Sequence, residues 1–454
     1  MKTKNVFLAL VLALALCLSC LATTAFAAIT DPAKGKEGTP DNPAQAAITK
    51  LLRLPVGTAV PEATFRFQVT SETVDGAAAT AANMPLIGTD ANVPGKVAGN
   101  VEIKYLGTET GTAITNNILT LPKEYNLFAT TVWPHAGVYV YTVKEIAGTY
   151  AIADPNHEAM KYSAAEYTLR VYVKDGVKTN GEKVCYIFAI GAYATVKDDN
   201  GPAVEEKIIV TPGGGEDITL DYSQMIFSNN YAKTNGSVDP EDPDPTDPDE
   251  ATLSVSKAVT GDFGSSTVYF RYELTVNTPN IVTAPALPTT FNAYIVEGST
   301  IIGAADLADA AKNNATLGGT DKNGKAYITF TSGTAAMFSL KANQKLVFIN
   351  TPVGTDYDVE EAGTTAYLAS VNVTYDGAAG YYTNTGATLG AGVAANGQLV
   401  GEAANSADFT NKRDDVTPTG LNLNDLPFIG MIVLALGGIA AFAVVMARKR
   451  KRYN

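Results

Sequence analysis

Apolar residues alternate with polar residues along two long stretches of this chain. The spacing is clear in segments 65–69, 139–143 and 167–173, and it resumes at Leu253 after an interruption. Successive side chains of a β-strand point to opposite faces of a sheet, so a period of two predicts half-buried strands. Gly, Asn and Asp turns separate these segments, and helical periodicity is scarce except around 304–312. The pattern predicts an all-β protein built as β-sandwiches.

The interruption at 236–250 reads GSVDPEDPDPTDPDE. Repeated Pro keeps such a segment extended, and mutual repulsion of the acidic residues stretches it further. The Asp spacing raises the alternative of a calcium site, but Pro breaks the loop geometry and no ligand-turn glycine recurs. We therefore predict no metal site but an acidic Pro-rich linker at 235–250, between a first sandwich at 48–234 and a second at 251–416.

The N-terminal end has the composition of an export signal. Two lysines precede an apolar core from Val6 to Leu21, and Ala25-Phe26-Ala27 offers the small residues that signal peptidase requires. We predict a signal peptide at 1–27 and a flexible leader, rich in Pro, Gly and charge, at 28–47. Cys185 is then the only cysteine of the exported chain, which excludes an intramolecular disulfide. Its apolar strand neighbours predict a buried core thiol.

The C-terminal segment, 417–454, combines three features in order. Thr417-Pro418-Thr419-Gly420 is followed by an uncharged apolar run at 426–447 and a basic cluster at 448–452. The run is about as long as the roughly 20 helical residues that cross a bilayer, and the basic cluster fits a cytoplasmic end. A permanent tail anchor is one interpretation. The motif favours instead a Gram-positive wall-sorting signal, in which a sortase cuts between Thr419 and Gly420 and transfers the new acyl end to an amine.

Composition and charge argue against several function classes. The net charge is −13, and it becomes more negative when the leader lysines and the basic tail are removed. Such a chain is a poor partner for nucleic acid or an anionic membrane. His135 and His157 are the only histidines, and no nucleophile-elbow, metal or phosphate-loop pattern occurs. A secreted enzyme is therefore disfavoured, and we expect neither a cofactor nor conventional enzymatic activity.

Matching motifs occur in the same order in the two predicted sandwiches. Each sandwich opens with a lysine in an apolar strand, carries a late glutamate that is soon followed by Ala-Gly, and closes on Phe-Ser-Asn or Phe-Thr-Asn. The matched pairs are Lys50 and Lys257, Glu145 and Glu361, and Asn229 and Asn411. One fold is therefore used twice.

Strand parity places all of these polar residues on apolar faces. For a single Lys or Glu, a strand end whose side chain reaches water is the more common explanation, but six matched positions favour burial. Buried Lys and Glu shift toward their neutral forms. A neutral Lys is a nucleophile, and a protonated Glu can polarise an Asn carboxamide and shuttle protons. The sequence thus predicts a single-turnover, autocatalytic Lys–Asn amide bond with loss of ammonia.

With these motifs the chain resembles the Gram-positive backbone pilins of the streptococcal T-antigen type, which are built from tandem isopeptide-forming Ig-like (CnaB-like) domains. The resemblance covers nearly the whole exported chain and is strongest in TLSVSKAVTGDFG, TPVGTDYDVEEAG and FTNKRDDVTPTG. It implies two triads, namely Lys50, Glu145 and Asn229, and Lys257, Glu361 and Asn411. It also aligns the sorting signal with Thr417–Gly420 and places LPFIG (Leu426–Gly430) at the start of the membrane span.

One departure from the family concerns polymerisation. Family shafts grow when a first-domain lysine shortly before the closing Asn attacks the sorting threonine of the neighbouring subunit. Here the matching place falls near Tyr222, and no Lys occurs between Lys207 and Asn229. Lys207 is the nearest candidate, followed by Lys178 and Lys183, and an ordinary surface charge is the alternative for Lys207.

Two interpretations of the whole chain follow from this resemblance. The first is a structural pilus subunit on the cell wall, with sortase, other pilin copies, peptidoglycan and a host surface ligand as partners. The second is a wall-anchored adhesin or stalk protein that is not polymerised.

Overall fold

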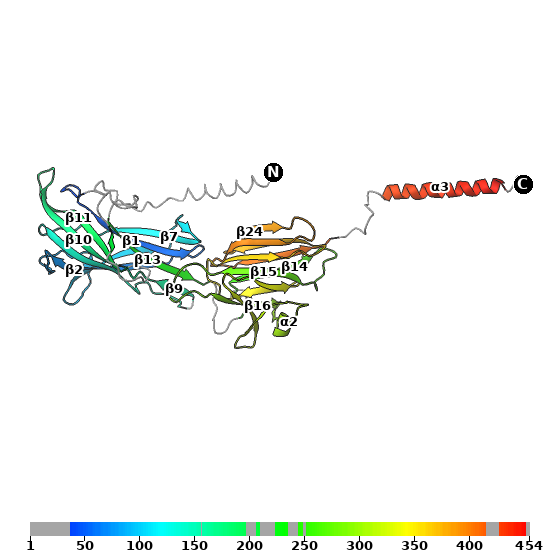
Figure 1. Ribbon diagram of the computed structural model, residues 1–454, viewed down its shortest axis with the longest axis horizontal. Coiled ribbons are helices and arrows are strands. Elements are labelled where there is room, and N and C mark those ends of the chain that lie inside the picture. The colour runs from blue at the N-terminus through cyan, green and yellow to red at the C-terminus, as the bar shows by residue number, and fades with distance from the viewer. Residues whose placement is uncertain are drawn as a thin grey trace.

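The computed structural model describes residues 37–155, 157–196, 206–208, 223–234, 244–247, 251–414 and 426–450. Two sheet-rich domains follow one another along the chain, and the helix α3 (Leu426–Arg450) lies beyond them (Figure 1). The all-β prediction is confirmed.

The first domain contains two sheets around one core. Its strands are β1 (Ala46–Pro55), β2 (Glu62–Val74), β3 (Ala77–Ala78), β4 (Thr89–Asp90), β5 (Val97–Leu106), β6 (Ile114–Thr115), β7 (Ile118–Asn126), β8 (Gly137–Ile146), β9 (Glu158–Lys161), β10 (Glu166–Val177), β11 (Lys183–Val196), β12 (Glu206–Ile208) and β13 (Ser223–Lys233). One sheet has the order β6-β7-β1-β13-β9, and the other has the order β12-β11-β10-β8-β2-β5-β4, with β3 paired to β2.

The second domain repeats this plan. Its strands are β14 (Leu253–Thr260), β15 (Phe270–Asn277), β16 (Thr290–Glu297), β17 (Thr300–Ile301), β18 (Leu317–Thr320), β19 (Ala326–Thr331), β20 (Ala336–Leu340), β21 (Gln344–Phe348), β22 (Asp356–Glu361), β23 (Leu368–Tyr375), β24 (Ala378–Thr385), β25 (Val393–Leu399) and β26 (Ser406–Lys412). The sheet orders are β18-β19-β16-β21-β14-β26-β23-β24, with β17 on β16, and β20-β15-β22-β25. The helical pattern around 304–312 forms only the short helix α2 (Ala304–Ala308).

Alternation along the strands fills both cores. On β2, Phe65, Phe67 and Val69 are buried while the residues between them are not. On β8, Tyr139 and Tyr141 are fully buried in the same way. Each large apolar side chain that is fully buried stabilises the fold by roughly 1.5–3 kcal/mol. The hydrophobic pattern therefore fixes which face of each strand lies inside.

The first and last strands of each domain are parallel neighbours. β1 pairs with β13, and β14 pairs with β26. Leu52 is opposite Asn229 in the first pair, and Val259 is opposite Asn411 in the second. Because faces alternate along a strand, each Asn lies on the same face as the lysine two residues before its partner. The chain ends of both domains thus bring one Lys and one Asn to the same side of one sheet.

The predicted flexible leader ends earlier than expected. The Gly38 amide donates to Phe188 O at 2.8 Å, and the Ala44 amide donates to Ile187 O at 2.9 Å. In the described part of the chain β12 pairs with β11 at 192–194, which leaves the backbone carbonyls of β11 near 187 to this segment. Residues 38–44 therefore lie along β11 and β1 begins at Ala46, which corrects the C-terminal part of the predicted leader at 28–47.

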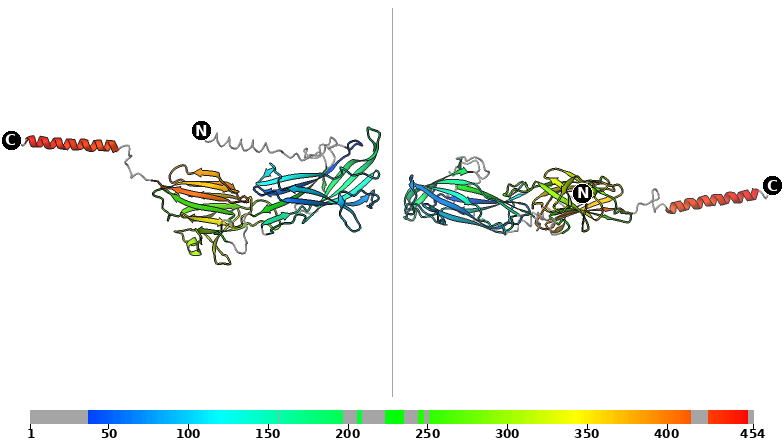
Figure 2. Two further views of the ribbon diagram at one scale, coloured as in Figure 1. Left: turned by 180° about the vertical axis from the view of Figure 1, so that it is seen from behind. Right: turned by 90° about the horizontal axis from the view of Figure 1, so that it is seen from below.

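The two domains lie end to end and contact each other directly (Figure 2). Glu402 of the second domain accepts hydrogen bonds from Lys233 Nζ at 2.8 Å and from the Ala59 amide at 2.7 Å. Thr234, just after β13, forms a β-bridge with Pro352. Of the predicted linker at 235–250, the structure describes only 244–247, so the linker remains a prediction.

At the C-terminus α3 covers the apolar run at 426–447. Within the described part of the chain, no helix has the length and apolarity needed to cross a membrane. The signal peptide at 1–27 and the motif at 417–420 lie outside the described residues.

Candidate functional site

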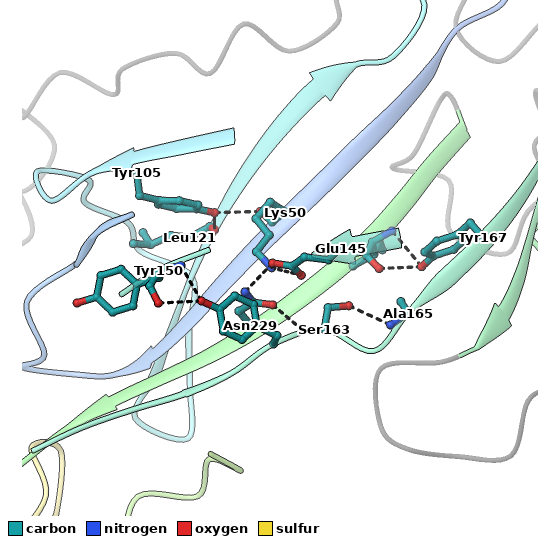
Figure 3. Close-up of polar contacts among 11 residues, drawn as sticks. Lys50, Tyr105, Leu121, Glu145, Tyr150, Ser163, Ala165, Tyr167 and Asn229 are labelled. Carbon is teal, nitrogen blue, oxygen red and sulfur yellow. Dashed lines mark hydrogen bonds and ion pairs between the residues drawn. The ribbon is translucent and has the colours of Figure 1, made fainter. Parts of the chain in front are cut away.

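The first domain holds a buried cluster of one Lys, one Glu and one Asn (Figure 3). Lys50 Nζ lies 2.8 and 2.7 Å from the two carboxylate oxygens of Glu145. Asn229 Nδ2 donates to Glu145 Oε1 at 2.8 Å. The side chains of Lys50 and Glu145 are fully excluded from solvent, and Asn229 is fully buried. The structure therefore brings together three polar residues that are 95 and 84 positions apart in sequence.

Both sheets contribute to this cluster. Lys50 on β1 and Asn229 on β13 come from one sheet, and Glu145 on β8 comes from the facing sheet, where it is paired with Phe67. The Tyr105 hydroxyl lies 2.8 Å from Leu121 O and 3.1 Å from Lys50 O. This contact fixes the backbone at the lysine, and burial raises the pKa of Tyr105, which keeps its hydroxyl a donor.

A backbone amide completes the first cluster. The Ser163 amide donates to Asn229 Oδ1 at 2.7 Å. A backbone N–H can only face the oxygen of a carboxamide, so this bond settles the orientation of the Asn229 side chain. The Asn229 nitrogen consequently faces Glu145, on the opposite side from Ser163 (Figure 3).

The second domain repeats the cluster with the same elements. Lys257 Nζ lies 2.6 Å from Glu361 Oε2, and Asn411 Nδ2 donates to Glu361 Oε1 at 2.5 Å. Lys257 is on β14, Asn411 on β26, and Glu361 on β22 of the facing sheet, paired with Tyr272. The Tyr272 hydroxyl also donates to Glu361 Oε2, at 2.8 Å.

Burial is the main influence on the pKa of Lys257 in the second cluster. Loss of solvent lowers the pKa of Lys257 from 10.5 to about 8, although Glu361 opposes this shift. About a tenth of a lysine with this pKa is neutral at pH 7. Aromatic rings surround both amines, with Phe270 4.1 Å from Lys257 Nζ and Phe65 4.6 Å from Lys50 Nζ, measured to the ring centroids. Burial likewise raises the pKa of Tyr272 well above its ordinary value, so Tyr272 remains a donor.

The arrangement supplies each part that amide exchange requires. An amine that can lose its proton in a dry pocket is a nucleophile. A carboxyl group in hydrogen-bond reach of both the amine and the amide nitrogen can carry a proton from one to the other. Each cluster places Glu between Lys and Asn in this way.

The residues predicted to join subunits are described only in part. Lys207 lies on β12 opposite Tyr193, and the position of its side chain is outside the described structure. Thr419 and Gly420 lie outside the described residues. Lys178 is at the end of the β10–β11 hairpin, where its ammonium pairs with Glu182 at 3.0 Å.

The predicted buried core thiol of Cys185 is found only in part, because the residue packs against the first core but is not covered completely. The residue is partly exposed, and its thiol donates to Asp175 at 3.2 Å. Partial burial and Asp175 raise the pKa of Cys185. Asp175 and Cys185 are cross-strand partners near the end of the β10–β11 hairpin, where strand parity no longer implies a covered face.

Two donors to the Glu or Asn of a cluster were not identified from the sequence. Tyr272 stands in the motif Phe270-Arg-Tyr272, whose counterpart is Phe65-Arg-Phe67, and the Tyr–Phe difference was the available signal. Ser163 acts through its backbone, so its residue type gives no signal.

Comparisons with known proteins match both domains. Residues 46–232 match the family described as Spy0128-like isopeptide containing domain, and residues 251–413 match a domain of unknown function, DUF7601. A relative named "Pilin" from Streptococcus pyogenes serotype M1 is 25% identical over 196 residues, which are 43% of this chain and 48% of the relative. The chain thus matches about half the length of this curated relative.

Two solved structures are similar to this chain at low sequence identity. The crystal structure of the major pilin from Streptococcus pyogenes is 18% identical, with 82% of this chain and 100% of that chain covered and a TM-score of 0.28. The T3.2 major pilin of the same organism is 18% identical, with 82% and 98% covered and a TM-score of 0.27. The family match and the curated relative confirm the resemblance to Gram-positive backbone pilins. The resemblance is most specific in the first domain, because that domain matches the Spy0128-like isopeptide containing domain.

Proposed function

We propose that this chain is the structural subunit of a covalently assembled, sortase-linked cell-surface pilus, in which each domain is closed by a self-formed Lys–Asn isopeptide bond. The observation that carries the proposal is the repeated cluster, in which Glu contacts both Lys and Asn on adjacent first and last strands. The match of residues 46–232 to an isopeptide-containing family supports it.

The proposed reaction exchanges one amine for another at the Asn side chain. Neutral Lys50 Nζ bonds to Asn229 Cγ, and the Cγ–Nδ2 bond breaks. Glu145 takes one proton from the attacking nitrogen and passes it to Nδ2, which leaves as ammonia. Glu361 does the same between Lys257 and Asn411. Each Glu is regenerated, but the reaction happens once per domain, so the chain is a substrate of its own chemistry and not an enzyme.

The bonds suit a protein that bears tension. Each bond would join the first strand of an Ig-like (CnaB-like) sandwich to the last, so force applied at the domain's ends passes through covalent bonds and bypasses the hydrogen-bonded ladder. Closing a loop of more than 100 residues stabilises a domain by roughly 5 kcal/mol in the chain-entropy account of cross-links. The pairing of the first and last strands of a domain would therefore increase its resistance to tension as well as complete its sheet.

Surface attachment completes the proposal. A signal peptide at 1–27 directs export, and the apolar run at 426–447 holds the precursor until sortase cuts between Thr419 and Gly420. The new acyl end is then passed to Lys207 of another copy, or to peptidoglycan. Adhesion to a host surface is the role we assign to the assembled fibre.

A second function is a wall-anchored adhesin or stalk that is not polymerised. One observation favours it, namely that no lysine occurs between Lys207 and Asn229, where the family places its linking lysine.

Intact-mass spectrometry of residues 28–419 tests the isopeptide bonds. The wild type is expected to weigh less than its sequence by two ammonia molecules. A mass equal to that of the unmodified sequence would contradict the proposal.

Assembly is tested by blotting wall extracts that have been boiled in detergent. A pilus subunit gives a ladder of high-mass bands, and Thr419→Ala should remove the ladder and leave the chain in the membrane fraction. Lys207→Ala should reduce the ladder to a monomer band, while Lys104→Ala, a control at an exposed lysine on β5 that is not a linking candidate, should leave the ladder intact. A single band in the wild type would favour the unpolymerised adhesin.

A further inference from the structure

The two Asn side chains differ in what their oxygens contact. Asn229 Oδ1 accepts the Ser163 amide at 2.7 Å. Asn411 Oδ1 is buried and has no hydrogen-bond partner in the described part of the chain. Lys, Glu and Asn occur in both clusters, but only Asn229 has a backbone donor on its side-chain oxygen among the described residues.

Strand length explains why Ser163 is available. β9 ends at Lys161, and its pairing with β13 covers only residues 230–233 of β13. The chain turns away after β9, with the Ala165 amide donating to Ser163 Oγ at 3.2 Å. The Ser163 amide therefore lies outside the ladder and is directed at Asn229.

In the second domain the corresponding strand continues. β23 pairs with β26 from Leu368 opposite Lys412 to Thr374 opposite Ser406, so the pairing extends past Ala369, which is opposite Asn411. The backbone groups beside Asn411 consequently belong to the sheet. Among the described residues, no equivalent turn leaves an amide free to donate to the Asn411 side chain.

We propose that the Ser163 backbone amide is the oxyanion donor of the Lys50–Asn229 reaction, and this inference rests on the proposed isopeptide function. When Lys50 Nζ bonds to Asn229 Cγ, the C=O electron pair moves onto Oδ1, which becomes negatively charged. The Ser163 N–H stabilises that charge. As the pair returns, the Cγ–Nδ2 bond breaks and Nδ2 leaves as ammonia with the proton that Glu145 took from Nζ.

The same amide also selects the reactive orientation of Asn229. With Oδ1 held by Ser163, the nitrogen that must leave faces Glu145, its proton donor. In enzymes, removing one donor from an oxyanion hole slows the reaction by about 10²–10³-fold. We expect a loss of this size in the first domain alone.

The test replaces the backbone donor and leaves the side chain unchanged where possible. Nonsense suppression in cell-free translation installs the α-hydroxy analogue of serine at 163, which turns the N–H into an ester oxygen. Ser163→Pro removes the same N–H by ordinary mutagenesis. Ser163→Ala keeps the N–H and is the matched control.

Three readouts separate chemistry from folding. After a pulse of synthesis, samples are quenched in acid and digested, and the Lys50–Asn229 and Lys257–Asn411 branched peptides are quantified against time. Trp133, the only tryptophan, is buried in the first domain, so its fluorescence reports whether that domain has folded. The rate at which the Lys257–Asn411 bond forms in the same molecules serves as the internal reference.

The expected result is a Lys50–Asn229 bond that forms about 10²–10³-fold more slowly in the ester and Pro variants, with native Trp133 fluorescence and an unchanged second bond. Ser163→Ala should react at the wild-type rate. An ester variant that folds and cross-links as fast as the wild type would overturn the inference. Absence of both branched peptides from the wild type would instead refute the proposed function.

Discussion

The two domains hold the same three residue types on equivalent strands, but they surround them with different donors. In the first domain a backbone amide contacts the oxygen of Asn229, and Phe67 is the cross-strand partner of Glu145. In the second, Asn411 Oδ1 has no partner among the described residues, and Tyr272, in the place of Phe67, donates to Glu361. The extra donor of the first cluster therefore contacts Asn229, the residue that Lys50 would attack. The extra donor of the second cluster contacts Glu361, the residue that would carry the proton.

This difference separates what the reaction requires from what each domain adds. Lys, Glu and Asn, the facing sheet and the aromatic rings are common to both clusters. A donor on the Asn oxygen stabilises charge that develops only during the reaction. A phenol on the carboxylate stabilises charge that is already present before it. We infer that the shared set suffices for bond formation, and that Ser163 and Tyr272 adjust its rate and the stability of the unlinked domain.

The largest effect should come from removing the proton carrier of one domain at a time. Glu145→Gln and Glu361→Gln keep the shape of the side chain, so each variant should retain one ammonia and lose one bond. The affected domain should lose roughly 5 kcal/mol of stability, because its unfolded state is no longer cross-linked. Mass spectrometry measures the retained ammonia. Calorimetry measures the loss of stability, with one unfolding transition expected for each domain.

A matched control lies beside the second glutamate. Glu360 is on the exposed face of β22, so Glu360→Gln should change neither the mass nor the melting. If Glu361→Gln melted as the wild type does, the bond would not contribute to stability. If it lowered both transitions equally, the domains would not be independent in this respect.

A pH effect should distinguish the unlinked second domain from the linked one. Asn411→Ala prevents the bond but leaves Lys257 beside Glu361. The folded pKa of Lys257 is about 8 and its ordinary value is 10.5, so between these values the unfolded chain binds more protons than the folded one. Stability should therefore rise with pH across this window, by up to about 3 kcal/mol, and the excess cost of the buried charge is fully present below about pH 8.

Urea unfolding between about pH 7 and 10 measures this slope, and Lys257→Met with Asn411→Ala is the control because it lacks the titrating amine. In the wild type Lys257 would be an amide and would not titrate. The same slope in the control and the single variant would assign the effect to other groups.

Strand parity alone predicted which polar residues of the two sites face the apolar side of their strands. It separated Glu361, which is buried, from its neighbour Glu360, which is exposed. It also placed Lys50 and Asn229 on one apolar face, since a period of two needs only the local sequence. The repetition of the motif in two domains then made burial a better explanation than solvation. The overall β class followed from the same alternation.

Features that depend on where strands end could not be predicted this way. Ser163 contributes because β9 stops at Lys161, and that end is set by tertiary pairing. Cys185 follows the alternation but lies near a hairpin end with a partly exposed face. Residues 38–44 look like a polar leader, yet they bind β11 through backbone groups that composition does not reveal.

The smallest effect should come from Tyr272, and it sharpens the comparison because the first domain has Phe67 at the equivalent position. Tyr272→Phe removes a hydrogen bond to a charged group, which is worth roughly 1.5–3 kcal/mol, so the melting of the second domain should fall by a corresponding amount. Both ammonia molecules should still be lost, since Tyr272 contacts Glu361 and the first domain has Phe67, which carries no hydroxyl, at the equivalent position.

Tyr357 provides a closely matched control. It is equally buried, and its hydroxyl has no hydrogen-bond partner among the described residues. Removing an unsatisfied buried hydroxyl costs little and can stabilise a core, so Tyr357→Phe should leave the melting unchanged or raise it slightly. Equal destabilisation by the two variants would show that the phenol–carboxylate bond is not the cause. Retention of one ammonia in Tyr272→Phe would instead make the phenol a required part of the second site, and the two clusters would then differ in mechanism.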